Sequence, residues 1–284
     1  MRLEATDFSL YPQPKVDCHC HVLDPLGFPY ASDVGYRPAG QETGSAHYFA
    51  QVLEAYGAQH ALLVGPNSGY GTDNRALLSA IATGQGRFKG IAVVRRDAST
   101  AQLQDLQAQG VVGIAFNPSL HGLDYYADAG PLWGRLAALG MFVQVQADRD
   151  QWCALAPRMA ACGAPLLIDH CGRPPLGKGL QGESFAALLG LARTGRATVK
   201  LSGYAKFSME AFPFNDTAAH VHALLEAFGP AQCIWASDWP FLKAPSRLDY
   251  GSLLQLFGRT VPDAQTRRAI LWDTPLRLFG LGTP

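Results

Sequence analysis

Eight short apolar runs alternate along this chain with longer segments in which apolar residues recur every three or four positions. The runs are rich in Val, Ile, Leu and Phe and are bounded by Gly, Pro or polar residues, which is typical of buried strands. We predict strands over residues 15–22, 60–66, 89–94, 111–117, 141–146, 165–171, 197–202 and 233–239.

The segments between these runs carry start and stop signals of helices. Ser99 stands where an N-cap is expected, and Gly140, Gly163 and Gly229 follow helix-length stretches as C-terminal stops. We predict helices over residues 47–56, 73–82, 99–109, 131–139, 150–162, 183–194, 216–228, 250–257 and 263–279.

Strands that alternate with helices favour parallel pairing through right-handed crossovers, and eight such units close into a (β/α)8 TIM barrel. An open doubly wound sheet is the alternative, but it would carry a Gly-rich dinucleotide turn after its first strand, and the sequence has none there. The sequence shows no short repeat, low-complexity tract or linker-like change of composition. We therefore expect a single α/β domain over residues 1–284.

Composition narrows the class of protein. Of the 284 residues 48% are hydrophobic and 16% charged, and 23 basic residues balance 23 acidic ones. We therefore expect neither nucleic acid nor membrane as a partner, because the net charge is zero and no apolar run reaches the ~18 residues of a membrane span. The six cysteines fall in segments predicted to be buried, and no secretory signal is visible, so we expect reduced thiols and a cytoplasmic location.

The first predicted strand carries the densest chemistry, in the run Asp17-Cys18-His19-Cys20-His21. Simple strand alternation predicts that Asp17, His19 and His21 share one face and that the two cysteines share the other. A zinc knuckle built from both residue types is an alternative, but the alternation argues against it. Two neighbouring imidazoles can hold a metal ion or a reacting carbonyl.

Other polar residues stand at the carboxyl ends of the later strands, where TIM barrels place their active sites. His170 alone would be read as a core histidine and Asp238 as a turn former, but both lie at strand ends. The long segment 24–45, which contains Tyr30, follows the first strand and is a candidate lid. The remaining candidates at or after strand ends are Asn67, Asn117, His121, Gln144, Gln146, Asp169, Arg173, Lys200, Tyr204 and Lys206.

Four separated motifs resemble the lactonase branch of the amidohydrolase superfamily, and the similarity runs over about residues 15–281. The motifs are Asp17-x-His-x-His-Val22, Gly71-Thr-Asp-Asn-Arg75, Ile168-Asp-His-x-Gly-Arg-Pro174 and Trp235-Ala-Ser-Asp-Trp-Pro240. Most members of the superfamily hold divalent metals with histidines of strands one, five and six, a strand-four lysine or glutamate, and the strand-eight aspartate.

This chain departs from that metal-binding pattern. Asn117 stands on strand four and Gln144 on strand five, and amides are poor zinc ligands. The lactonase branch shows the same departures and includes a member that works without a metal, so we expect no required cofactor. An optional zinc or manganese ion at His19, His21 and Asp238 stays open.

The resemblance implies a hydrolase that opens a small lactone in sugar-acid or aromatic catabolism. Asp238 would take a proton from the attacking water, while His19, His21 and His170, one or more of them protonated, would polarise the ring carbonyl. The residues that we expect to bind substrate are Tyr30, Asn67, Asn117, His121, Gln144, Arg173, Tyr204 and Lys206.

Substrate charge and reaction class stay open at this point. Members that act on a pyrone dicarboxylate present arginines after strands four and seven, whereas this chain offers His121 and Lys206 there. A less charged lactone is therefore as good a candidate as the dicarboxylate. A metal-dependent decarboxylase of the same superfamily and a barrel that only binds a ligand are the alternatives, and the sequence does not give the oligomeric state.

Overall fold

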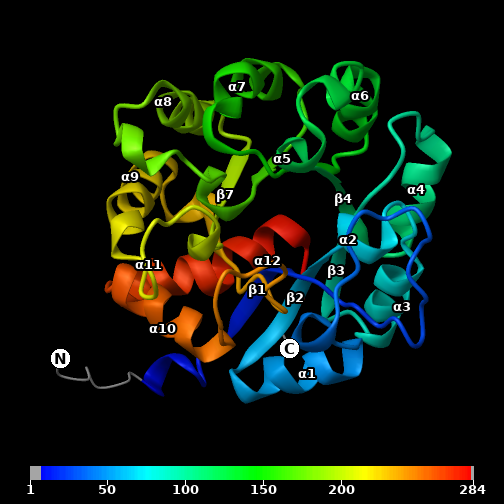
Figure 1. Cartoon of the computed structure of the whole chain (residues 1–284), viewed down its shortest axis with the longest axis horizontal. Coiled ribbons are helices and arrows are strands. Elements are labelled where there is room, and N and C mark those ends of the chain that lie inside the picture. The colour runs from blue at the N-terminus through cyan, green and yellow to red at the C-terminus, as the bar shows by residue number, and fades with distance from the viewer. Residues whose placement is uncertain (1–7, 283–284) are drawn as a thin grey trace.

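The structure, a computed structural model, describes residues 8–282. Its eight strands form one sheet in which each strand pairs in parallel with the next along the chain, from β1 to β8 (Figure 1). The strands are β1 (Lys15–Cys20), β2 (Ala58–Val64), β3 (Phe88–Ala92), β4 (Val111–Phe116), β5 (Phe142–Val145), β6 (Leu166–Ile168), β7 (Ala197–Leu201) and β8 (Cys233–Trp235). The predicted (β/α)8 barrel is confirmed.

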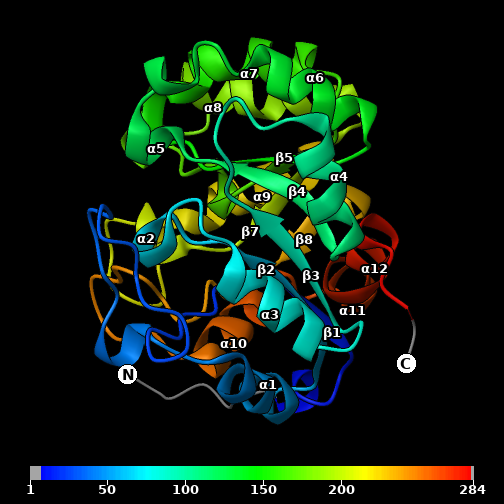
Figure 2. The same ribbon diagram turned by 90° about the vertical axis from the view of Figure 1, so that its right-hand side faces the viewer.

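Helices join the strands and cover the outside of the sheet. They are α1 (Ala46–Ala55), α2 (Asn67–Tyr70), α3 (Arg75–Thr83), α4 (Thr100–Ala108), α5 (Pro118–His121), α6 (Gly130–Ala138), α7 (Trp152–Ala161), α8 (Glu183–Gly190), α9 (Ala218–Phe228), α10 (Tyr250–Thr260), α11 (Ala264–Arg268) and α12 (Thr274–Phe279). Figure 2 shows α11 and α12 at one end of the strands, with α2 and α5 at the other.

The last predicted helix, 263–279, is interrupted. Residues Ala269–Asp273 form a π-helical turn between α11 and α12. Pro275 has no backbone N–H, so it cannot donate to the carbonyl of Leu271 as a regular α-helix would require. The helical path therefore continues, but its hydrogen-bond pattern changes before the proline.

The barrel closes between β1 and β8 at their carboxyl ends. Asp238 N donates to His19 O (2.9 Å), and His21 N donates to Trp239 O (2.8 Å). The two chains form an isolated parallel bridge between Cys20 and Trp239. This closure places the end of strand eight directly beside the histidines of strand one.

Two apolar clusters lie on opposite faces of the sheet. On β2, Ala61 and Leu63 belong to the larger cluster, which packs against the surrounding helices, whereas Leu62 belongs to the smaller one. The smaller cluster fills the barrel and includes Trp272 and Phe279 from the C-terminal segment. One end of the barrel is thus filled by apolar side chains, and the polar site occupies the other.

A β-bulge in β1 changes which side chains share a face. Asp17 pairs with Ala61 and Cys20 with Leu63, so β1 spans three residues where β2 spans two. Asp17 and Cys20 therefore face the helices, while Cys18 packs inside the barrel and His19 turns toward its polar end. The predicted alternation is wrong for Asp17 and for the pairing of the two cysteines, because the extra residue shifts the pattern by one position.

Asp17 supports the closure of the barrel. Its carboxylate accepts hydrogen bonds from Ser237 N (3.0 Å) and Ser237 Oγ (2.5 Å), and from His19 N (3.3 Å). Burial raises the pKa of Asp17 to about 6, although these hydrogen bonds act in the opposite direction. The carboxylate ties the end of strand eight to strand one.

Candidate active site

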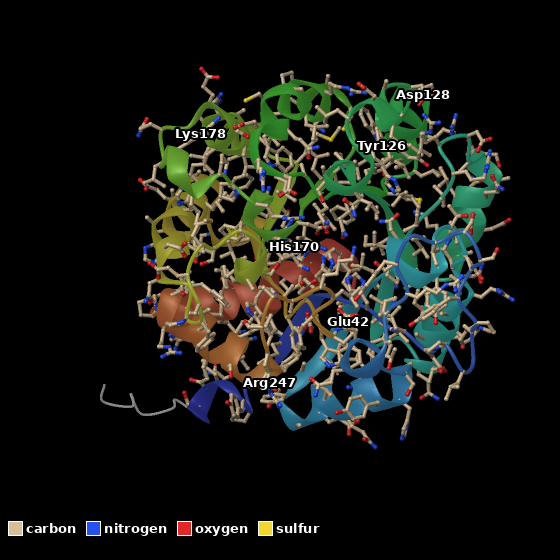
Figure 3. The ribbon with its side chains drawn as sticks, in the orientation of Figure 1. Glu42, Tyr126, Asp128, His170, Lys178 and Arg247 are labelled. Atoms are coloured by element: carbon tan, nitrogen blue, oxygen red, sulfur yellow. The ribbon has the colours of Figure 1, made fainter. Side chains whose placement is uncertain are left out.

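A cavity of about 460 Å³ opens at the carboxyl ends of the strands. His19 and His21 line it from the end of β1, and Asp238 lines it from the turn after β8. The residues expected to bind substrate that line it are Asn67, Asn117, Gln144, Arg173 and Lys206, and the strand-end candidates Gln146 and Asp169 line it as well. Figure 3 shows His170 near the middle of the ring of elements.

Asp238 is the centre of the site. Its Oδ1 lies 3.8 Å from His19 Nε2, 3.9 Å from His21 Nε2 and 3.7 Å from His170 Nε2. Its Oδ2 lies 2.9 Å from the Nζ of Lys206. Groups from four separate parts of the chain therefore meet at one carboxylate, as the positions at strand ends led us to expect.

The backbone leaves the extended conformation where these groups stand. β6 ends at Ile168 and β8 at Trp235, both shorter than predicted. His170 and Asp238 adopt left-handed conformations, with φ of 51° and 63°. Left-handed turns at non-glycine residues carry strain and cluster at functional sites, so both side chains are held by turns rather than by the strands themselves.

The Asp238 carboxyl is charged. Burial alone would raise its pKa, but Lys206, His170 and His21 outweigh burial and hold the pKa below the ordinary value. Because Lys206 contacts Oδ2, the other oxygen is the one that faces the three imidazoles.

The surroundings of the three imidazoles disfavour their protonation. Burial, joined by the charge of Lys200, holds the pKa of His19 well below its ordinary value, and burial also lowers the pKa of His21 and of His170. The expectation that one or more of them is protonated stays a prediction, and these pKa directions disfavour it. A neutral imidazole still offers one donor and one acceptor.

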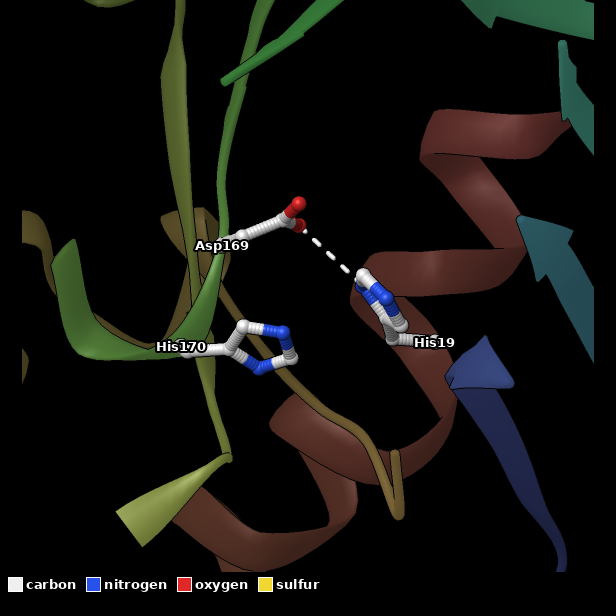
Figure 4. Close-up of side chains that lie close together, drawn as sticks. All are labelled: His19, Asp169 and His170. Atoms are coloured by element: carbon white, nitrogen blue, oxygen red, sulfur yellow. Dashed lines mark hydrogen bonds and ion pairs between the residues drawn. The ribbon is translucent and has the colours of Figure 1, made fainter. Parts of the chain in front are cut away.

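His170 approaches Asp238 without lining the cavity. It is buried, its Nδ1 lies 3.2 Å from Ser202 Oγ, and its ring packs against that of His19 with centroids 4.6 Å apart. Figure 4 shows His170 and Asp169 reaching toward His19 from the same turn after β6. The structure therefore places His170 behind the reacting face.

A buried polar cluster lies beneath His19. Lys200 Nζ lies 3.0 Å from Asp169 Oδ1 and donates to Gln144 Oε1 (2.6 Å), while Gln144 Nε2 donates to Asp169 Oδ2 (3.0 Å). Lys200 and Asp169 are among the candidates at strand ends, but we expected neither of them to act in catalysis or to bind substrate. The sequence feature that could have identified them is a charged residue inside an otherwise apolar strand, as for Lys200, or at the end of one, as for Asp169.

The far wall of the cavity is held by hydrogen bonds. Arg173 pairs with Asp148 (Nε to Oδ1, 3.1 Å) and donates to Ser119 Oγ (3.2 Å). Asn117 Oδ1 accepts from Leu120 N (3.1 Å) and so caps α5. Arg173 and Asn117 are thus partly occupied by protein partners.

Three predicted substrate-binding residues lie outside this cavity. Tyr30 donates to Pro38 O (2.8 Å) and packs on Tyr70, and His121 stacks on Tyr125 beside a neighbouring hollow. Tyr204 is buried in the core, because it begins a 3₁₀ turn in which residues two apart point to different sides and only Lys206 reaches the cavity. Among the described lining residues none comes from segment 24–45, so its role as a lid remains a hypothesis.

The donors could hold a metal ion by their spacing. One ligand atom each from His19, His21 and Asp238 lie within 4.8 Å of one another, as do atoms of His19, Asp169 and His170. Two imidazoles and a carboxylate suit zinc. However, each carboxylate already has an ammonium group about 3 Å away, Lys206 beside Asp238 and Lys200 beside Asp169, and these charges disfavour a second cation.

Comparison with known proteins agrees with this geometry. The chain matches the amidohydrolase family over residues 16–281. It is 33% identical to 4-sulfomuconolactone hydrolase of Rhizobium radiobacter, over 95% of this chain and 91% of that protein. It is 28% identical to 2-pyrone-4,6-dicarboxylate hydrolase of Comamonas testosteroni, over 94% of this chain and 90% of the relative.

Solved structures show the same barrel. A provisionally assigned 2-pyrone-4,6-dicarboxylic acid hydrolase from Pseudomonas putida superposes with a TM-score of 0.82 at 32% identity, over 95% of this chain and 98% of that one. A 2,6-dihydroxybenzoate decarboxylase from Rhizobium shares only the fold, with a TM-score of 0.66 at 16% identity. The alignment covers 95% of this chain and 99% of the decarboxylase chain.

Proposed function

This chain belongs to the amidohydrolase family, and from that premise we propose that it is a hydrolase that opens a small lactone, with a place in aromatic or sugar-acid catabolism. The relatives matched over most of their length carry the names of lactone hydrolases. The observation that carries the proposal is the position of Asp238, whose Oδ1 faces three imidazoles within 3.9 Å beside a cavity large enough for a small ring.

Lactone hydrolysis needs a base, an electrophilic contact and a place for the leaving oxygen. In our proposal Asp238 Oδ1 takes a proton from water while the water oxygen attacks the ring carbonyl. The negative charge on the carbonyl oxygen is met by an imidazole N–H. When the ring C–O bond breaks, the proton passes from Asp238 to the leaving oxygen, and the product is an open-chain hydroxy acid or its keto form.

The charges on the cavity wall favour a lactone with few anionic groups. Lys206 pairs with Asp238 and Arg173 pairs with Asp148, so these two cations are already matched by carboxylates. The third cation on the described wall, Lys243, has its Nζ over the ring of Tyr36. The described wall contains no pair of free arginines that could bind two carboxylates in bidentate fashion. His121, the other expected anion contact, lies outside the cavity.

We propose that turnover requires no metal ion, and the ammonium groups beside both carboxylates support this proposal. A zinc or manganese ion held by His19, His21 and Asp238 would polarise the carbonyl and lower the pKa of a bound water. In its absence, the imidazoles and Lys206 supply the positive and donor groups of the site.

The remaining expectations have partial support. Among the described residues, none of the helices is both long and apolar enough to cross a membrane. All six cysteines are free, which supports a reducing compartment and thus the proposed cytoplasmic location. We keep the absence of nucleic-acid partners as a proposal, supported by the zero net charge.

A panel of lactones assayed by proton release tests the function. We expect turnover of at least one neutral or singly charged lactone, unchanged by a chelator, and loss of turnover in Asp238→Asn. Carbon dioxide release from an aromatic acid, linked to stoichiometric metal, would instead support the decarboxylase. Binding without turnover across the whole panel would support a barrel that only binds a ligand.

A further inference from the structure

Lys200 is a buried cation whose donors are all matched inside the barrel. It stands on β7 with no exposed surface. Its Nζ lies 2.6 Å from Gln144 Oε1, 3.0 Å from Asp169 Oδ1 and 3.1 Å from His19 Nδ1. An ammonium group has three hydrogens and no lone pair, so these three contacts account for every donor that Lys200 has.

The contact with His19 decides where the imidazole carries its hydrogen. An ammonium nitrogen can only donate, so a hydrogen bond across the 3.1 Å between Lys200 Nζ and His19 Nδ1 requires Nδ1 to be bare and the hydrogen to be on Nε2. Asp169 Oδ1 lies 3.2 Å from the same Nδ1 and on its own would favour a hydrogen there. If Nδ1 did carry one, two N–H groups would point at each other in a fully buried position.

The neighbours of Lys200 hold its side chain in place. The Asp169 carboxylate supplies the opposite charge. Gln144 joins the two, because its oxygen accepts from Lys200 and its nitrogen donates to Asp169 Oδ2 (3.0 Å). The amide on strand five is therefore a structural partner of the lysine, and both ends of its side chain are in use.

We propose that Lys200 is a positioning residue that holds His19 in the tautomer with hydrogen on Nε2, so that this donor points toward Asp238 and the cavity. His19 Nε2 faces Asp238 Oδ1 at 3.8 Å and borders the space that a substrate carbonyl would fill. The tautomer follows from the hydrogen bonds alone, and only its catalytic consequence rests on the proposed function.

The paired imidazoles then have opposite tautomers. His21 Nδ1 lies 2.8 Å from the carbonyl oxygen of Val64, which can only accept, so the hydrogen of His21 is on Nδ1 and its Nε2 is bare. The histidine pair thus presents one donor, from His19, and one acceptor, from His21, to the same cavity. Beside Asp238, the donor can contact the carbonyl oxygen and the acceptor can contact the attacking water.

Nitrogen-15 NMR of the whole protein tests the tautomers without any substrate. The protein is labelled at histidine ring nitrogens and measured above pH 7.5, and the His19 signals are assigned by their loss in His19→Gln. We expect the hydrogen on Nε2 of His19 and on Nδ1 of His21. In Lys200→Met we expect the His19 hydrogen to move to Nδ1, where Asp169 accepts it.

Lys15→Met is the matched control. Lys15 is equally buried, on β1, but its Nζ donates to the backbone carbonyls of Tyr11, Gln13 and Tyr56 and contacts none of the site residues. We expect it to leave the His19 tautomer unchanged. For an active lactone, kcat should fall about a hundredfold in Lys200→Met, the size of a lost oxyanion donor, with a smaller change in KM.

Hydrogen on Nδ1 of His19 in the wild-type protein would overturn the proposal, as would an unchanged tautomer in Lys200→Met. If Lys200→Met does not fold, the wild-type spectrum decides by itself. Failure of every lactone in the assay would count against the proposed function and would leave the NMR result readable.

Discussion

Replacing Lys206 by methionine removes the charge beside the proposed base and should change the pH dependence of turnover. In the native protein Lys206 Nζ lies 2.9 Å from Asp238 Oδ2 and is the strongest of the groups that lower the pKa of Asp238. Without it, burial of the carboxyl is opposed only by weaker contacts. The pKa of Asp238 should therefore rise above its native value.

The size of the shift follows from the charges and their exposure. Two unit charges about 4 Å apart attract by about 4 kcal/mol at an effective dielectric constant of about 20. The Lys206 side chain is 22% exposed, so solvent screens part of this attraction. We take about half, which is about 2 kcal/mol or roughly 1.5 pKa units.

The direction of the change in kcat follows because Asp238 must be a charged carboxylate to act as a base. In the wild type the Asp238 pKa lies below 3.8, so kcat should be flat from pH 8 down to about pH 5. In Lys206→Met the carboxylate takes up a proton earlier as the pH falls, and the acid limb of kcat should move up by about 1 to 2 units.

The assay is product absorbance from an active lactone across about pH 3 to 8.5 in one mixed buffer, so that the acid limbs of both proteins are sampled. Lys243→Met is the control, because Lys243 lines the same cavity but its Nζ lies over the ring of Tyr36. An acid limb that stays in place in Lys206→Met, at full folding, would refute Asp238 as the titrating base.

Four further outcomes are expected. Asp238→Asn should lower kcat at least a hundredfold with an unchanged melting temperature. His21→Ala should lower kcat about a hundredfold, measured against the same lactone. Exhaustive chelation should leave kcat and the melting temperature unchanged, and a loss restored by zinc would contradict this. Burial raises the pKa of Asp17 from 3.8 to about 6, so Asp17 contributes fully to the free energy of unfolding below pH 3.8. This contribution falls by about 3 kcal/mol as the pH rises through 6. In denaturant titrations at pH 4 and pH 7, Asp17→Asn should therefore lack this pH-dependent loss of stability.

The barrel could be predicted because its strands are buried on both faces and read as near-continuous apolar runs. The carboxyl ends of those runs then pointed to His19, His170 and Asp238, which the structure brings together around one oxygen. This part of the site depends only on topology, since parallel strands present all their carboxyl ends at one side.

The directions of individual site side chains depend on local backbone features that leave no pattern in the sequence. A bulge between Asp17 and Cys20 rotates His19 toward the site and Asp17 away from it, and alternation alone cannot reveal an extra residue. The 3₁₀ turn after β7 sends Tyr204 into the core and Lys206 into the cavity. The lysine at position 200 was visible in a strand, but its three partners come from three other strands.

The closure between β1 and β8 has a consequence for how this enzyme loses activity on heating. The amide hydrogens of His21 and Asp238 are held by the bonds that close the ring of strands, and the side chains of the same two residues belong to the proposed active site. Local opening between β1 and β8 would therefore move these two side chains apart, and we expect it to precede unfolding of the rest of the barrel. Hydrogen exchange at these two amides should consequently track heat inactivation more closely than exchange at amides in the middle of β4 or β5.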